Sequence, residues 1–382
     1  MDTDKGVAGM KTKAALLMQQ PGKWEVVEAD LDGPQPHEVL VRLAYSGLCH
    51  SDEHVAKGDG KINHFPYCGG HEGAGVVVEV GAAVRALRPG DHVVTSFIPS
   101  CGRCRWCATG RQNLCDNGAL MMVGSQLDGG YRLHYQGRDV ARSGLMGCFS
   151  ELSVMSEWSC IRIPDHLPLR AAALLGCGVP TGWGSAVNGA QVQPGQVIIV
   201  MGVGGIGINS VQGAAHAGAT RVIAVDPVRL KRETALTMGA TDAVESIEAA
   251  TELARALTNG QGADASIVTV GLLSPDHIAQ AFESVRKGGI VVVTSAAPMR
   301  EVGIPISPFM LTMYQKRLQG CLYGMMSPSA AVPRFIAMYE QGQLKLDELV
   351  SKTYPIEEIN SGYDDMYAGV NIRGLLEFAG RG

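Results

Sequence analysis

Four cysteines form a tight cluster, and their spacing indicates metal chemistry more directly than any other feature of the chain. Cys101, Cys104, Cys107 and Cys115 follow the pattern C-x2-C-x2-C-x7-C. Four thiolates this close in sequence can surround one ion in a closed tetrahedral site, at Zn–S distances of about 2.3 Å. Two disulfides are the alternative, but a 382-residue chain with ten cysteines and no apolar leader is not typical of a disulfide scaffold. We therefore predict a structural zinc site.

A glycine motif further along the chain indicates a dinucleotide. Gly202, Gly204 and Gly207 form G-x-G-x-x-G, with Gly205 between them, directly after the apolar stretch VIIVM. Asp226 ends the next apolar stretch, about 20 residues past the motif, as the dinucleotide fingerprint requires. The glycines allow the backbone to approach a pyrophosphate at a helix N-terminus, and the Asp accepts from ribose hydroxyls and repels a 2′-phosphate. The motif therefore predicts NAD rather than NADP.

Three dispersed residues could hold a second metal ion. Cys49, His71 and Cys177 lie in the glycine-flanked stretches SGLCHSDEH, GGHEGAG and LGCGVPTGWG. A catalytic zinc uses three protein ligands and keeps one position open, and Cys2His is one such set. Taken singly, a cysteine is more often a small hydrophobic residue of the core. Beside a dinucleotide motif and a four-cysteine cluster, the three residues together predict a catalytic zinc.

The pattern of apolar, glycine and proline residues changes along the chain. Residues 10–45 and 73–98 carry short valine-rich stretches between glycine and proline turns, which is typical of β-rich structure. Residues 118–150 are predicted to be a loop-rich excursion. From about residue 196, apolar stretches alternate with helical patterns, as in a doubly wound parallel sheet. After about residue 323 the chain returns to a helix and short strands. These patterns predict an α/β protein of two domains.

Composition excludes several classes of partner. The formal net charge is −5, which gives no basic field for nucleic acid. No apolar run approaches the roughly 18 residues that a membrane span needs. The first residues, MDTDKGVAG, are polar and lack a signal core. We therefore expect a cytoplasmic protein in which residues 1–9 are an alternative start or an ordered tail.

Several stretches together resemble the zinc-dependent medium-chain alcohol dehydrogenases over almost the whole chain, from Met10 to Phe378. The matching stretches include GLCHSDEH, GGHEGAG, GCGVPTGWGSAV, GVGGIG and NIRGLLEF. The resemblance implies a GroES-like catalytic domain formed by residues 10–178 and 323–382, and a Rossmann NAD-binding domain formed by residues 179–322. It also implies reversible oxidation of an alcohol to an aldehyde or ketone, with hydride transfer to NAD and two zinc ions per chain.

The resemblance assigns roles to further residues. It implies that Glu72 can approach the catalytic zinc, that Asp52 orients His71, and that Ser51 and His54 form a proton relay. The implied cofactor contacts are His50 and Arg373 for the pyrophosphate, Thr181 for the nicotinamide end and Lys231 for the adenosine ribose. The implied pocket wall consists of Phe97, Leu120 and Met146.

Within the family, the sequence is most similar to the nicotinoprotein type. The similar stretches are SFIPSCGRCRWCATGRQNLCD and VMGVGGIGINSVQGAA. These enzymes are assayed with N,N-dimethyl-4-nitrosoaniline (NDMA), and some are associated with the redox carrier mycofactocin. The likeness implies NAD(H) that stays bound and is reoxidised by a second carrier. It also implies a homo-oligomer, a dimer or tetramer, with GGIVVVTS at the contact.

Two alternatives are open at this point. One is a thiol-dependent formaldehyde dehydrogenase that uses exchangeable NAD on the same fold. The other is a non-enzymatic NAD(H)-binding sensor, which would tend to lose Cys49, His71 or Cys177. All three residues are present, so the sequence favours an enzyme.

Overall fold

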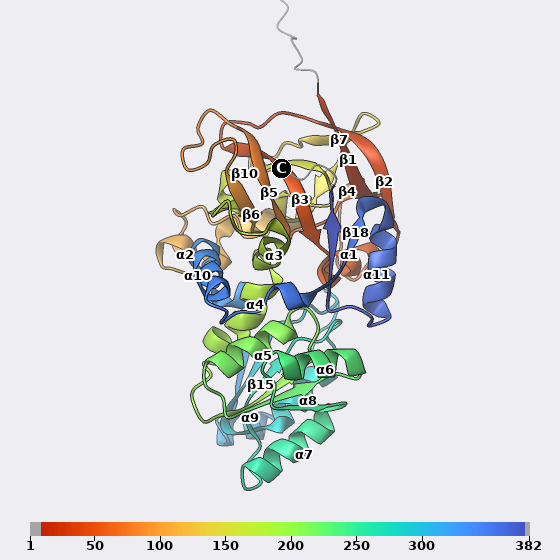
Figure 1. Cartoon of the computed structure of the whole chain (residues 1–382). Helices are drawn as coiled ribbons and strands as arrows, with labels where there is room; N and C mark the ends of the chain where they lie inside the picture. The colour runs from red at the N-terminus through yellow and green to blue at the C-terminus, as the bar shows by residue number, and fades with distance from the viewer. Residues whose placement is uncertain (1–8, 379–382) are drawn as a thin grey trace, which may run out of the picture.

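The computed structural model describes residues 9–378, so the expected role of residues 1–8 lies outside the described part. Figure 1 shows a strand-rich body that contains both the beginning and the end of the described chain, and a second body in which helices surround a sheet. This arrangement confirms the predicted α/β fold. Within residues 9–378, no helix is long and apolar enough to cross a membrane.

Two sheets form the strand-rich body. Their orders are β8-β7-β2-β1-β4-β9 and β11-β6-β5-β3-β19-β18, with β10 paired to β3. The last strand of the chain pairs antiparallel with β3, which explains why the chain returns to this body at its end. The strands are β1 (Met10–Leu17), β2 (Trp24–Leu31), β3 (Glu38–Gly47), β4 (Tyr67–Cys68), β5 (Gly73–Val80), β6 (His92–Thr95), β7 (Leu133–Tyr135), β8 (Arg138–Asp139), β9 (Ala141–Arg142), β10 (Leu152–Ser156), β11 (Cys160–Ile163), β18 (Val350–Pro355) and β19 (Arg373–Glu377).

A six-stranded parallel sheet forms the second body, in the order β14-β13-β12-β15-β16-β17. This is the doubly wound order, and its switch point lies between β12 and β15. The strands are β12 (Val197–Met201), β13 (Arg221–Val225), β14 (Asp242–Val244), β15 (Ala263–Val268), β16 (Val285–Val293) and β17 (Arg317–Gly320). The domain boundaries at 178/179 and 322/323 stay a prediction.

The helices divide between the two bodies. In the strand-rich body, α1 (His50–Lys57) and α2 (Arg105–Ala108) carry predicted site residues. The others there are α3 (Leu169–Ala172), α10 (Pro328–Glu340) and α11 (Ile359–Tyr367). The junction and the parallel sheet carry α4 (Gly178–Gly184), α5 (Gly207–His216), α6 (Arg229–Thr237), α7 (Ile247–Leu257), α8 (Pro275–Ser284) and α9 (Pro308–Met313).

Successive side chains of β12 point to opposite faces of the parallel sheet, and helices cover both faces. Ile198 and Val200 pack into a core shared with α4 and α5, whereas Ile199 packs into a core shared with α7 and α8. All three side chains are fully buried, as expected for a strand covered on both faces. The loops at the carboxyl ends of these strands therefore remain free to form a binding crevice.

The stretch GGIVVVTS, predicted to form the oligomer contact, does not lie at an edge of the sheet, and the contact itself stays a prediction. That stretch forms most of β16, which lies between β15 and β17 inside the sheet. The edge strand is β17, with the less apolar sequence RLQG. A long apolar run indicates a strand buried on both sides, and an edge strand tolerates polar residues better.

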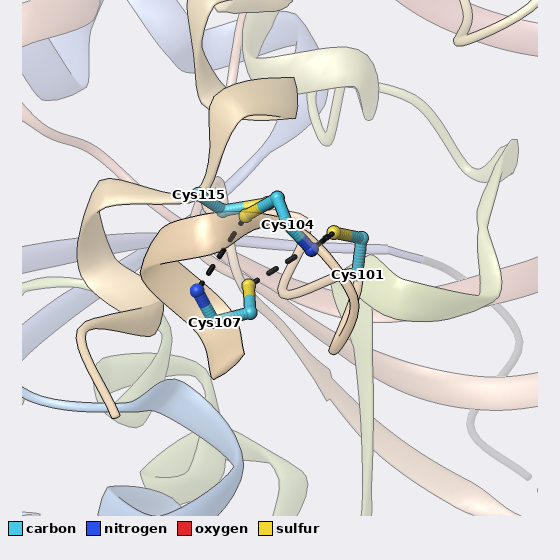
Figure 2. A group of neighbouring side chains, drawn as sticks. All are labelled: Cys101, Cys104, Cys107 and Cys115. Carbon is cyan, nitrogen blue, oxygen red and sulfur yellow. Dashed lines mark hydrogen bonds between the residues drawn. The ribbon is translucent and has the colours of Figure 1, made fainter. Parts of the chain in front are cut away.

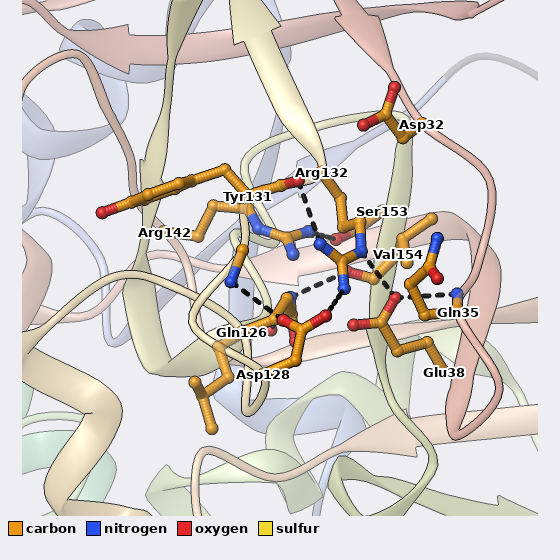
Figure 3. A network of polar contacts seen from close by, with 12 residues as sticks. Asp32, Gln35, Glu38, Gln126, Asp128, Tyr131, Arg132, Arg142, Ser153 and Val154 are labelled. Carbon is orange, nitrogen blue, oxygen red and sulfur yellow. Dashed lines mark hydrogen bonds and ion pairs between the residues drawn. The ribbon is translucent and has the colours of Figure 1, made fainter. Parts of the chain in front are cut away.

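Segment 118–150 is firmly attached to the strand-rich body. Arg132 Nε donates to Glu38 Oε2 at 2.9 Å, and the same guanidinium also contacts Asp128 (Figure 3). Arg142 is buried and donates to the carbonyl of Val154, and burial lowers the pKa of Arg142 to about 10. The segment also contains β7, β8 and β9. It is therefore a packed part of this body, and its short strands leave it as loop-rich as predicted.

Candidate active site and metal centres

The four clustered cysteines converge on one point (Figure 2). Cys101 Sγ lies 3.9 Å from Cys107 Sγ, and Cys104 Sγ lies 4.0 Å from Cys115 Sγ. A zinc–sulfur tetrahedron has edges of about 3.8 Å, whereas a disulfide needs a separation of about 2.05 Å. All ten cysteines of the chain are free. The cluster therefore fits one metal ion and excludes the disulfide alternative.

Local backbone supports the thiolates of this cluster. The N–H groups of Cys104 and Cys107 donate to the sulfurs of Cys101 and Cys104 at 3.4 and 3.5 Å (Figure 2). A backbone hydrogen bond from Asp116 is the main cause that lowers the pKa of Cys104 to about 6. Hydrogen bonds to a thiolate favour its charged form, and the thiolate is the form that binds a metal.

The lobe around this cluster also contacts the returning chain. The amide of Asn113 donates to the carbonyl of Leu322 at 3.2 Å. Cys107 and Cys115 pack with Ile98 and Tyr323 in a small separate core. The four-cysteine lobe therefore supports Tyr323, which lines the cavity described below.

The dispersed residues form a second cluster at the junction of the two bodies. One ligand atom each from Cys49, His71, Glu72 and Cys177 lies within 4.8 Å of the others, and all four residues are buried. Cys49 directly precedes α1, His71 lies just before β5, and Cys177 directly precedes α4. Asp52 Oδ2 lies 3.0 Å from His71 Nδ1, which leaves Nε2 of His71 for the cluster. Two sulfurs and one imidazole are donors that zinc prefers.

The pKa values of the residues in this cluster differ from their ordinary values. A hydrogen bond from Cys177 is the main cause that holds the pKa of Cys49 well below its ordinary value, and the same contact raises the pKa of Cys177. Burial opposes the charged form of His71, but Asp52 and Cys49 outweigh burial and raise the pKa of His71. A metal cation would replace the shared protons.

Glu72 connects this cluster to the dinucleotide loop. Its buried carboxylate forms an ion pair with the guanidinium of Arg373. Burial lowers the pKa of that guanidinium. A Cβ on Gly205 would lie only 2.4 Å from Arg373 Cδ, so the side chain of Arg373 lies directly against the glycine loop. Arg373 thus contacts both the metal cluster and the expected pyrophosphate site.

The glycine loop has the geometry that the fingerprint predicts. It connects β12 to α5, and Gly202 has a φ of +87°. A Cβ on Gly207 would lie 1.8 Å from the carbonyl oxygen of Gly202, so no other residue fits there. Asp226 directly follows β13, and its two carboxylate oxygens accept from the N–H groups of Val203 and Val228 at 3.1 and 2.9 Å. The carboxylate is therefore fixed where an adenosine ribose would bind.

Replacing Asp226 by Ser or Gly is expected to relax the preference for NAD over NADP, because the change removes the carboxylate that repels a 2′-phosphate. Dissociation constants of both cofactors, measured for the wild-type and variant proteins by titration, test this. Wild-type protein that bound NADP as tightly as NAD would contradict the role of Asp226.

One cavity of about 580 Å³ joins the second cluster to the glycine loop. Most residues predicted from the sequence line it: Cys49, His50, Ser51, Asp52, His54, His71, Phe97, Cys177, Thr181, Gly202, Gly204, Gly205, Asp226, Lys231 and Arg373. Two predicted residues lie behind this lining, since Glu72 is fully buried and Gly207 packs against Gly202. Burial lowers the pKa of His50 to about 4.

The predicted pocket wall is correct at one position and wrong at two. Phe97 lines the cavity, but Leu120 and Met146 are not among its described lining residues. A tight helical turn over Asp116–Met122 presents Met121 and Met122 instead. Met146 is fully buried in the core, and its neighbours Ser143 and Gly144 face the cavity.

The remaining lining residues were not identified from sequence. Thr269–Leu272 and Thr294–Ala297 directly follow β15 and β16. The rule that ligands bind at the carboxyl ends of parallel strands could have identified them. No sequence pattern identifies four other residues that line the cavity, Tyr67, Met299, Leu322 and Tyr323.

The two residues of the predicted proton relay have other partners. Ser51 Oγ donates to Cys49 Sγ at 3.2 Å. His54 Nδ1 lies 3.2 Å from Asp59 Oδ2, and His54 Nε2 lies 2.8 Å from the carbonyl oxygen of Gly271. The predicted relay passes through the cofactor ribose between these residues, and it stays a prediction.

A doubly wound sheet whose glycine loop faces a Cys2His cluster is the arrangement of a metal-dependent dehydrogenase. The family model described as alcohol dehydrogenase GroES-like domain matches residues 35–165, and the one described as zinc-binding dehydrogenase matches residues 205–341. The chain belongs to this family of zinc-binding alcohol dehydrogenases, which confirms the resemblance seen in the sequence.

Individual relatives match over almost the full chain. The NDMA-dependent alcohol dehydrogenase of Amycolatopsis methanolica is 48% identical, covering 96% of this chain and 99% of that protein. The S-(hydroxymethyl)glutathione dehydrogenase of Synechocystis is 35% identical, covering 97% and 100%. The crystal structure of benzyl alcohol dehydrogenase from Acinetobacter calcoaceticus superposes with a TM-score of 0.90 at 26% identity, covering 97% and 100%.

Proposed function

We propose that this protein reversibly oxidises a small alcohol to an aldehyde or ketone, with a zinc ion held by Cys49, His71 and Cys177 and with NAD as the hydride acceptor. The observation that carries the proposal is the shared cavity, in which the cluster and the glycine loop face the same space. When bound, zinc supplies Lewis-acid activation of the alcohol hydroxyl, and the nicotinamide supplies the hydride acceptor.

The protein's own residues position and deprotonate the substrate. Asp52 fixes the ring of His71 at 3.0 Å, and partners of this kind tune metal sites. Ser51 Oγ lies 3.2 Å from Cys49 Sγ, within reach of a hydroxyl held at the cluster, and takes its proton as the first member of the relay. Phe97 packs edge-on against His71, with ring centroids 5.5 Å apart, and excludes water from that side.

The composition of the cavity favours a small uncharged alcohol over a thiol adduct. Phe97, Met121 and Leu322 give the substrate end an apolar lining. Among the described lining residues, the lysine and arginine side chains are Lys231 and Arg373. Lys231 lies beside the glycine loop, and Arg373 lies between that loop and the metal cluster, where Glu72 pairs with its charge. An adduct of formaldehyde with an acidic thiol such as glutathione would need cations at the substrate end. The greater identity to the NDMA-dependent relative also favours the alcohol.

We further propose that NAD(H) behaves as a prosthetic group and is reoxidised in place by a second carrier. The 48% identity to an NDMA-dependent enzyme supports this proposal. Differences in affinity among related complexes lie mainly in the dissociation rate, so retention requires contacts that slow release.

Extensively desalted protein is expected to keep its cofactor and to turn over alcohol with NDMA when no NAD is added. Alcohol with free NAD should accumulate little NADH, because the bound cofactor does not exchange. Absorbance assays of the dye and of NADH measure both reactions. Desalted protein that is inactive until NAD is added, and then builds up NADH steadily, would be an ordinary exchanging dehydrogenase.

We also propose a homo-oligomer, a dimer or tetramer, that assembles through the β17 edge. This edge strand lies near α9, where Phe309 and Met313 are 63% and 64% exposed. Exposed apolar side chains beside an open strand edge are typical of an association surface.

A further inference from the structure

We propose that Asp59 is a positioning residue that closes the cleft over the bound cofactor, by holding the imidazole of His54 against the opposite body. This inference deepens the proposed function and rests on it, because it names a contact that would slow the release of NAD(H). The likeness to other enzymes identifies no residue for that task, whereas the contacts of Asp59 do.

The end of α1 places the Asp59 carboxylate beside His54. The helix ends at Lys57, and Gly58 follows with a φ of +95°. The N–H of Asp59 then donates to the carbonyl of His54 at 2.9 Å. This reversal brings Asp59 Oδ2 to within 3.2 Å of His54 Nδ1. Asp59 therefore fixes the orientation of the ring from one side.

The other side of the ring contacts the dinucleotide-binding body. His54 Nε2 lies 2.8 Å from the carbonyl oxygen of Gly271, which lies just after β15. The side chain of His54 is 11% exposed, so water competes weakly for this contact. The imidazole thus bridges the two bodies at the wall of the cavity that all three residues line.

A second contact joins the same segment to the next loop. The backbone N–H of Met299 donates to the carbonyl of Asp59 at 3.4 Å. Met299 follows β16, the neighbour of β15 in the parallel sheet. Through His54 and Asp59, the end of α1 is therefore tied to two loops at the carboxyl edge of the sheet, where the dinucleotide binds. A cofactor between these layers can leave only after the contacts open.

The Asp59 carboxylate pairs with one ring nitrogen of His54 and the Gly271 carbonyl oxygen with the other. Lys57 does not compete for the carboxylate, because its Nζ lies over the ring of Tyr367 at 3.4 Å and near Glu53 at 3.8 Å. The ring of His50 lies 6.2 Å away, centroid to centroid.

The rate at which NADH leaves the holoenzyme tests the inference. Protein whose cofactor has been reduced is mixed with excess NAD, and the loss of bound-NADH fluorescence gives the dissociation rate constant. Asp59→Ala should raise this constant roughly fivefold or more, as expected for a charged hydrogen bond that is partly exposed. Asp59→Glu should restore slow release, since it returns the carboxylate. The control Glu53→Gln removes a carboxylate from the same helix that does not cross the cleft, and it should match the wild type.

A rate constant for Asp59→Ala within twofold of the wild type would overturn the inference, even if the wild type retains its cofactor. Equal acceleration by Glu53→Gln, or no rescue by Asp59→Glu, would also overturn it, because either result would indicate general damage to α1. Rapid release by the wild type itself would contradict the prosthetic cofactor, and the ratio between variant and wild type would still decide the role of Asp59.

Discussion

Replacing Cys49 by Ala is expected to lower kcat/KM for alcohol oxidation by about three orders of magnitude or more, while the protein stays folded. The substitution removes a thiolate from the Cys2His set, so the remaining His71 and Cys177 cannot hold zinc in a three-ligand site. Cys49 is buried but lies at the wall of the cavity and not in the centre of a core. Dye-coupled kinetics and circular dichroism measure the two effects separately.

Cys160 provides a matched control for this substitution. Its thiol belongs to neither metal cluster and lies at the start of β11. Cys160→Ser should therefore keep the activity of the wild type. More than a tenth of wild-type activity in Cys49→Ala would contradict the assignment of Cys49 to the catalytic zinc.

Replacing Cys104 by Ala is expected to have the opposite pattern, with a large loss of stability. A structural zinc contributes folding free energy directly, and a loss of even about 3 kcal/mol would lower the Tm of a chain of this length by roughly 4 °C. The lobe packs on Tyr323 through Cys107 and Cys115, so its loosening should also reduce activity in part. Calorimetry gives the Tm, and elemental analysis gives the zinc content.

Two zinc ions per chain are expected in the wild-type protein, and one in each of the variants Cys49→Ala and Cys104→Ala. Cys49→Ala should keep a Tm closer to that of the wild type, because its cluster lies at a cavity and not inside a lobe. Active wild-type protein with one zinc or none, or Cys104→Ala with an unchanged Tm, would contradict separate catalytic and structural sites.

The residues that chemistry restricts most were predictable from the sequence. Metal ligation limits residue type to a few donors, and backbone approach to a pyrophosphate requires glycine. For that reason Cys49, His71 and Cys177, which are far apart in sequence, were predicted together and lie together in the structure. The alternation of strands and helices likewise predicted the parallel sheet.

The pocket wall and the cleft contacts depend on features that sequence patterns do not encode. Met121 and not Leu120 lines the cavity, because the short helix over Asp116–Met122 decides which side chains face it. The strand β14 has only three residues, too few for a periodic pattern. The acceptors for His54 and Met299 include backbone carbonyls, which every residue type offers, so the closure around Asp59 became visible only in three dimensions.

The central claim is that an alcohol reduces NAD that is already bound beside the Cys49–His71–Cys177 cluster. The most direct test is the absorbance near the NADH band when alcohol is added to desalted wild-type protein without dye or added NAD. We predict a single rise of about one NADH per chain that stays with the protein on a further desalting column, and no rise for Cys49→Ala. The absence of a rise in wild-type protein that contains zinc and NAD, or an equal rise in Cys49→Ala, would contradict the claim.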